Sequence, residues 1–178
     1  MRLLARVWPG RPGETVLDLP CGAGRLLSLL RERFGARVLQ ADGSLAMLRE
    51  AAARAAAPRA QADALAPPFA DRSVDGVVCF RFLHHLPADA ADRAIAGACA
   101  VARRFVVASF FHPCSAHGLR RLVGSWLGRP SRRYARTLGA IDRAFARHGF
   151  RRTAVAAELP FARDLWVAAF ERAPSTLG

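Results

Sequence analysis

Three aspartates each end a short apolar run in the first third of the chain. They are Asp18, Asp42 and Asp63. A carboxylate at the end of a strand accepts hydrogen bonds from ribose hydroxyls or from an exocyclic amine. One such acid is more often a helix cap or a solvated side chain. Three of them at successive strand ends indicate a site for a ligand with a ribose and a base.

A glycine-containing turn, residues 20–25, follows the first of these aspartates. Gly22 and Gly24 let the backbone pass close to a ligand, and the amino end of the next helix suits a carboxylate. A dinucleotide-binding loop requires a further glycine where Leu27 stands, and a Walker loop requires a lysine, which the chain lacks. Taken alone, the turn is equally consistent with a plain strand-to-helix connection.

Short apolar runs alternate with Ala-, Leu- and Arg-rich helical stretches along the chain. This alternation predicts an α/β domain of parallel βαβ units with helices on both faces of the sheet. The last two runs predict a hairpin that adds one antiparallel strand. The expected strands are 15–20, 37–42, 59–63, 74–82, 104–111, 151–159 and 164–171. The expected helices are 24–34, 44–56, 88–102 and 116–148, the last interrupted near 128–130.

The composition fits one globular domain over residues 1–178, with 52% hydrophobic and 23% charged residues. All 27 basic residues are arginine, a choice that a GC-rich bacterial genome explains, and the net charge is +13. The four cysteines are too widely spaced for a zinc site or a disulfide framework, so we expect reduced thiols, no metal and a cytoplasmic protein. No signal peptide or membrane-spanning run is expected.

Four stretches resemble consecutive motifs of the class I S-adenosylmethionine-dependent methyltransferases: 16–25, 38–48, 62–64 and 74–86. The resemblance implies a Rossmann-like, doubly wound, mostly parallel sheet of seven strands in the order 3-2-1-4-5-7-6, with the last strand antiparallel. It divides the domain into a cofactor-binding core (about 13–111), a basic helical lid or substrate segment (about 115–150) and a hairpin (151–172). Related enzymes often close the site with a longer N-terminal helix. The 14 residues before the first expected strand therefore predict either an open pocket or a chain start further upstream.

The same resemblance implies a site for S-adenosylmethionine. The turn 18–24 would hold the methionine part, Asp42 the ribose and Asp63 the adenine. Pro20 stands where a glycine is common in the family, and proline offers no backbone N–H. The expected cofactor-binding residues are Asp18, Pro20, Cys21, Gly22, Gly24 and Arg25 in the turn, Asp42, Gly43 and Met47 beside the adenosine, Asp63, Ala64 and Leu65 at the adenine, and Phe80 and Arg81 at the amino acid end.

Three histidines follow the fourth and fifth expected strands and are candidates for a general base. We rank His85 first, His112 second and His84 third. Methyl transfer needs a base only when the acceptor must lose a proton. A histidine in this position is also commonly a packed or capping residue.

Residues 118–152 hold ten arginines and one acid, a net charge of +9. An apolar stripe that includes Trp126 predicts an amphipathic helix there. Three interpretations stay open: a helix packed on the core with solvated arginines, a lid over an acidic substrate, and contact with an anionic membrane surface.

The short chain favours a small-molecule or lipid-like acceptor, anionic or amphipathic as one option, with Trp126 and Arg163 as candidate substrate-binding residues. RNA is disfavoured because no added RNA-binding domain is visible. The alternative is a catalytically silent protein of this fold that binds the cofactor, a partner or a membrane.

Overall fold

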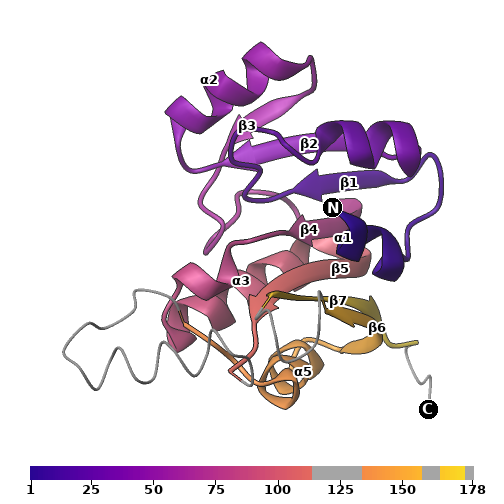
Figure 1. The fold of residues 1–178 in the computed structure, drawn as a ribbon, viewed down its shortest axis with the longest axis vertical. Coiled ribbons are helices and arrows are strands. Elements are labelled where there is room, and N and C mark those ends of the chain that lie inside the picture. The colour runs from indigo at the N-terminus through magenta and orange to yellow at the C-terminus, as the bar shows by residue number, and fades with distance from the viewer. Residues whose placement is uncertain (114–133, 158–164, 175–178) are drawn as a thin grey trace.

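A seven-stranded sheet forms the centre of the protein, with strands in the order β3-β2-β1-β4-β5-β7-β6 (Figure 1). The structure is a computed structural model that describes residues 1–113, 134–157 and 165–174. β7 is antiparallel to both of its neighbours, and the other neighbouring pairs are parallel. This confirms the expected fold class and strand order. The strands are β1 (Thr15–Asp18), β2 (Arg37–Asp42), β3 (Arg59–Gln61), β4 (Val74–Cys79), β5 (Ala102–Phe111), β6 (Phe150–Ala157) and β7 (Leu165–Arg172).

Alternate side chains of the central strand β5 enter two separate cores. Val106, Ala108 and Phe110 pack with α3 and α5, whereas Phe105 and Val107 pack on the opposite face with α1 and η1. Period-two burial on both faces is the pattern of a sheet covered by helices on both sides, as expected. The helices are α1 (Arg2–Val7), η1 (Leu29–Arg33, a π-helix), α2 (Leu45–Arg54), η2 (Leu83–His85, a 3-10 helix), α3 (Ala88–Val101) and α5 (Leu138–Ala146). Within the described ranges, no helix is long and apolar enough to cross a membrane.

Three predicted boundaries are wrong by three residues or more, and the strands expected at 15–20 and 59–63 end two residues early, at Asp18 and Gln61, so Asp63 does not end a strand. The fourth strand ends at Cys79 rather than at residue 82, because Arg81 takes a left-handed backbone conformation with φ of +57°. The expected helix 24–34 begins only at residue 27, after a run of turns, and continues as a π-helix over Leu29–Arg33. Residues 134–137 are not helical, since Ala135 forms an isolated β-bridge with Phe111 and α5 begins only at Leu138.

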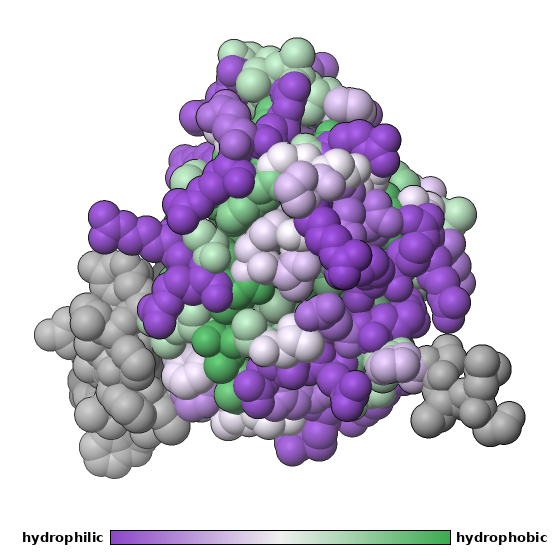
Figure 2. All heavy atoms as spheres, turned by 90° about the vertical axis from the view of Figure 1, so that its right-hand side faces the viewer, coloured by the Kyte–Doolittle hydropathy of each residue, from purple (hydrophilic) through white to green (hydrophobic). Residues whose placement is uncertain are grey.

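The amino edge of the sheet is held together by ion pairs. Glu14 pairs with Arg104, and Asp75 pairs with Arg103 at 2.5 Å. Asp75 also accepts a hydrogen bond from the Thr15 N–H at 2.9 Å, and this bond holds the pKa of the Asp75 carboxyl below its usual range. Figure 2 shows hydrophilic side chains on both sides of a paler, partly hydrophobic band on this side of the molecule. The opposite, carboxyl edge carries the predicted site.

Candidate functional site

The turn after β1 is tied to both strands that flank β1. The Leu19 N–H donates to a carbonyl of β4 at 2.9 Å, and the Cys21 N–H donates to a carbonyl of β2 at 2.8 Å. Gly22 and Gly24 have φ values of +52° and +72°, a backbone conformation that residues with a side chain rarely adopt. The turn is therefore a fixed piece of backbone at the end of the central strands.

Gly24 also lies against the layer beneath the turn. A Cβ at this position would come within 3.0 Å of both the Ala51 Cβ and the Gln40 Nε2. Conformation and space therefore both call for glycine at Gly24, and the turn packs directly on α2 and β2.

Asp42, at the end of β2, holds the turn from the other side. Its Oδ2 accepts from the Gly22 N–H at 2.8 Å, and its Oδ1 accepts from the Ser44 N–H at 2.8 Å. A carboxylate has about four acceptor positions, so two remain for a ligand. These bonds fix the orientation of the Asp42 carboxylate before any ligand arrives.

Asp18, at the end of β1, is 1% exposed, and neither of its carboxylate oxygens has a hydrogen-bond partner among the described residues. Burial raises the pKa of Asp18 to about 7; the Gln40 amide opposes this rise and the charge of Asp42 adds to it. A buried carboxylate without a partner is rare and costly. Such a group is suited to receive a donor or a cation from a ligand.

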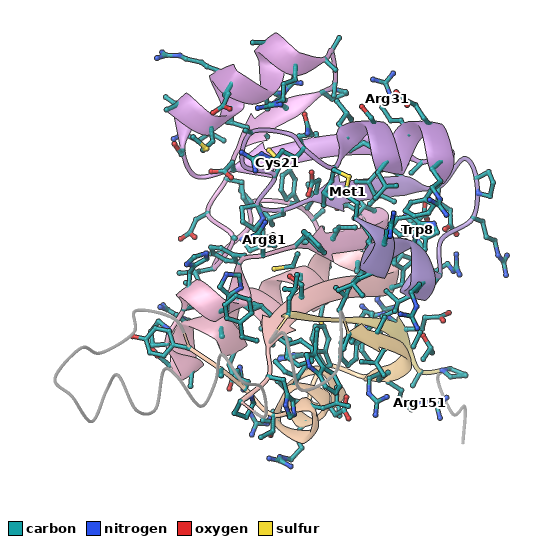
Figure 3. All side chains as sticks on the ribbon, viewed as in Figure 1. Met1, Trp8, Cys21, Arg31, Arg81 and Arg151 are labelled. Carbon is teal, nitrogen blue, oxygen red and sulfur yellow. The ribbon has the colours of Figure 1, made fainter. Side chains whose placement is uncertain are left out.

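A cavity of about 680 Å³ opens at this edge of the sheet. Met1, Cys21 and Arg81 come from three distant parts of the chain and gather around it (Figure 3). Ten of the predicted residues line the cavity: Asp18, Pro20, Cys21, Gly22, Arg25, Asp42, Met47, Phe80, Arg81 and His85. The structure thus brings together the turn, the end of β2 and the end of β4.

Several predicted residues lie behind or beside the cavity wall. Gly24 packs beneath the turn, and Gly43 accepts a bond from Gln61 Nε2 at 3.0 Å through its carbonyl. Asp63 is exposed and accepts from the Leu65 N–H at 2.9 Å, while the neighbouring Ala64 is buried. The expected adenine-binding segment therefore forms a local turn beside the cavity and is not part of its wall.

The cavity wall also includes Ala23 of the predicted turn and three residues that the sequence analysis missed, namely Met1, Leu26 and Glu50. Glu50 follows Met47 by three positions on α2, so helical spacing could have placed both on one face. Nothing in the sequence pattern pointed to Met1.

The three candidate histidines occupy different surroundings. His85 is exposed and lines the cavity. His84 is 3% exposed and stacks on Phe111 with ring centroids 3.9 Å apart. His112 is half-buried and stacks on Trp166 at 4.6 Å, and burial lowers its pKa. Of the three, His85 alone borders the cavity.

The thiols near the site stay protonated at neutral pH. Burial and the nearby carboxylates raise the pKa of Cys21 to about 12, and burial does the same for Cys79. A protonated thiol is a poor nucleophile and metal ligand. Across the part of the chain that the structure describes, no group of three His, Cys, Asp or Glu side chains could hold a metal ion.

Several arginines of the basic stretch 118–152 form ion pairs on the surface. Arg136 and Arg147 both pair with Asp92, and Arg152 pairs with Asp142. The candidate substrate-binding residues Trp126 and Arg163 lie outside the described residues, as does the predicted apolar stripe.

Residues 16–104 match the methyltransferase domain family. A curated relative, the chloroplastic magnesium protoporphyrin IX methyltransferase of Arabidopsis thaliana, is 31% identical over 149 residues, which are 78% of this chain and 47% of the relative. The chain thus spans about half the length of that relative.

Solved structures share the fold. The magnesium protoporphyrin IX methyltransferase of Synechocystis PCC 6803, with bound SAH (S-adenosylhomocysteine), superposes with a TM-score of 0.80 at 23% identity, covering 91% of this chain and 75% of the other. An S-adenosylmethionine-dependent methyltransferase from Mesorhizobium loti gives a TM-score of 0.75 at 21% identity and covers 95% of both chains.

Proposed function

Because this chain belongs to the methyltransferase domain family, we propose that it transfers a methyl group from S-adenosylmethionine to a small-molecule or lipid-like acceptor. The observation that carries the proposal is the pair of aspartates on the cavity. Asp18 is buried with both carboxylate oxygens unpartnered among the described residues, and Asp42 is held in place by two backbone N–H groups.

The chemistry of this cavity fits the cofactor. Asp18 would receive the ammonium group of the methionine part, because a lone buried carboxylate gains most from a cationic donor. Asp42 would accept the ribose hydroxyls with its two remaining acceptor positions. The wall carries three carboxyl groups, Asp18, Asp42 and Glu50, which suit the cationic groups of the cofactor.

The protein's part in the reaction is to bind, orient and exclude water. When bound, S-adenosylmethionine supplies an activated methyl group for an in-line displacement. The fixed turn and Asp42 would hold the donor in one orientation, which is where most of the rate gain in such a reaction arises. His85, on the cavity wall, would accept a proton from an acceptor that must lose one.

A small acceptor that is anionic or amphipathic is supported by two observations, one for its size and one for its charge. The curated relative is named for a small molecule, magnesium protoporphyrin IX. The net charge of +13 favours an anionic or amphipathic acceptor over a cationic one.

Calorimetry with S-adenosylmethionine and SAH at pH 7.5 tests the proposal. We expect both to bind, and Asp42→Ala to weaken SAH binding by more than ~10-fold because the ribose loses its acceptor. Asp71→Ala is the matched control, since Asp71 is an exposed aspartate that does not line the cavity. A chain that binds neither ligand contradicts the proposal, and an unchanged affinity in Asp42→Ala contradicts the role of Asp42.

A further inference from the structure

Gln40 is a buried amide on β2, the strand beside β1. It lies on β2 directly beside Asp18 on β1, where the two residues are register partners, and it is 0% exposed. Neither its Nε2 nor its Oε1 has a hydrogen-bond partner among the described residues. Burying an unpaired amide costs ~1–3 kcal/mol. A polar side chain that is fully buried without a partner therefore calls for an explanation.

The Gln40 amide lies directly below the glycine turn. A Cβ on Gly24 would lie only 3.0 Å from the Gln40 Nε2. The amide therefore packs against the Gly24 backbone, in space that a side chain would occupy. Asp18 ends the strand that leads into the same turn and lines the cavity. Gln40 thus lies at the back of the site, next to the carboxylate and the turn, without reaching the cavity wall.

We propose that Gln40 is a positioning residue: when the cofactor binds, its Nε2, which has no partner among the described residues, donates a hydrogen bond to one oxygen of the neighbouring Asp18 and leaves the other oxygen to face the ammonium group. The inference rests on the proposed function. It extends that function by one residue, which acts through Asp18 and not on the ligand itself.

The charges around Asp18 show why a donor is needed there. Asp42 on β2 and the thiols Cys21 and Cys79 surround Asp18, and the Asp42 charge favours the neutral form of Asp18 together with burial. The positive charge of Arg59 partly opposes the rise in the pKa of the Cys21 thiol, which burial causes first of all. Across the cavity lie Arg25, Glu50, Arg81 and His85.

The Gln40 amide is the group that favours the ionised form of Asp18. A hydrogen bond donated to a carboxylate lowers its pKa. Without the amide, burial and Asp42 act unopposed, so the pKa of Asp18 rises further and the carboxylate is neutral over a wider pH range.

SAH binding as a function of pH tests this role. In the natural protein, affinity should rise with pH up to about 7, where Asp18 ionises, and fall above ~8, where an α-amino group loses its proton. Gln40→Met keeps the length of the side chain and removes the donor. We expect the acidic limb of the profile, the pH range over which affinity rises, to move upward by half to one pH unit. This shift lowers SAH affinity at pH 6 by ~3- to 10-fold.

Two controls separate positioning from mere packing. Gln61→Met makes the same change on the next strand and should leave the acidic limb in place. In an Asp18→Asn background, Gln40→Met should cause no further shift, because the group that titrates has been removed. A folded Gln40→Met protein whose acidic limb matches that of the natural protein overturns the proposal.

A measurement on the free protein keeps the two proposals distinguishable. Carbon-13 NMR of the Asp18 carboxyl reports its titration without any ligand, and Gln40→Met should raise the midpoint. Should Gln40→Met fail to fold, Gln40→Glu provides the second variant and should raise the midpoint further through a second acid. An unmoved Asp18 midpoint refutes the role of Gln40, whereas the absence of SAH binding by the natural protein at every pH refutes the proposed function.

Discussion

The carboxyl edge of the sheet has two parts that are built in different ways. The cofactor part, at the ends of β1, β2 and β4, consists of a backbone turn and two carboxylates, one of them fixed by N–H groups at 2.8 Å. The neighbouring part, at η2 and the ends of β5 and β7, consists of stacked rings: His84 on Phe111 and His112 on Trp166. The first part is organised to hold a polar ligand in one pose. The second part is held by ring packing, which fixes its shape but does not direct hydrogen bonds at a ligand.

Asp18 gives the largest expected effect in the cofactor part. Asp18→Asn should lower SAH affinity at pH 7.5 by ~30-fold, since a charge-assisted bond is lost. His112→Asn, in the ring-packed part, should leave that affinity within about twofold. Calorimetry on both variants compares the two parts, and equal losses would remove the distinction between them.

The same substitution should change how stability depends on pH. The pKa of Asp18 is raised in the folded protein from 3.8 to about 7, so its neutral form favours folding at low pH and that stability is lost as the pH rises from about 4 to about 7. Asp18→Asn should therefore match the natural protein near pH 4 and exceed its unfolding free energy by a few kcal/mol at pH 8. Urea unfolding at the two pH values measures this, and a variant that is less stable at pH 8 contradicts it.

Gly24→Ala should destabilise the cofactor part by about 2 kcal/mol, because it adds left-handed backbone strain to a 3.0 Å approach to Ala51 and Gln40. Gly139→Ala is the matched control: Gly139 is exposed on α5, where the added methyl group meets only a flexible arginine end. That control should stabilise the protein slightly. Thermal unfolding of both variants reports the contrast, and equal shifts would argue against a rigid turn.

His84 and His85 are neighbours in sequence with opposite expected behaviour. His84→Ala should cost on the order of 2 kcal/mol, because His84 is buried and its ring stacks on Phe111. His85→Ala should change unfolding free energy by less than ~0.5 kcal/mol, since the side chain is exposed on the cavity. Denaturant unfolding measures both free energies. A larger loss for His85→Ala than for His84→Ala would contradict the packing role of His84 and the exposed position of His85.

Substitution of Arg81 should have a small effect on stability, in the stabilising direction. Its φ of +57° is held by a bond from its N–H to the Ser109 hydroxyl at 2.5 Å. Glycine adopts this conformation without strain, so Arg81→Gly should raise the unfolding free energy by up to ~1 kcal/mol while SAH affinity falls a few-fold. A loss of stability in Arg81→Gly would show that the conformation carries no strain.

The sheet could be predicted because its signals are local and repeated. Apolar runs, helical spacing and the closing hairpin each point to the same order of elements. Two carboxylates of the cavity, Asp18 and Asp42, were also found from the sequence, since strand ends in parallel sheets meet at one edge. Asp63 lies two residues past the end of β3 and does not line the cavity.

What the sequence could not supply depends on register and on backbone conformation. That Gln40 lies beside Asp18 requires the pairing of β1 with β2, which no motif encodes. The early end of β4 requires a left-handed arginine, and arginine carries no signal for that conformation. The non-helical residues 134–137 result from a bridge to Phe111, a long-range contact.

A crystal structure of the chain with SAH tests the central claim most directly. The account predicts the ribose hydroxyls on the Asp42 carboxylate and the amino group on Asp18, both within hydrogen-bond distance, in the cavity beside Cys21 and Arg81. SAH bound away from these two aspartates, or crystals that take up no SAH at saturating concentration, would contradict it.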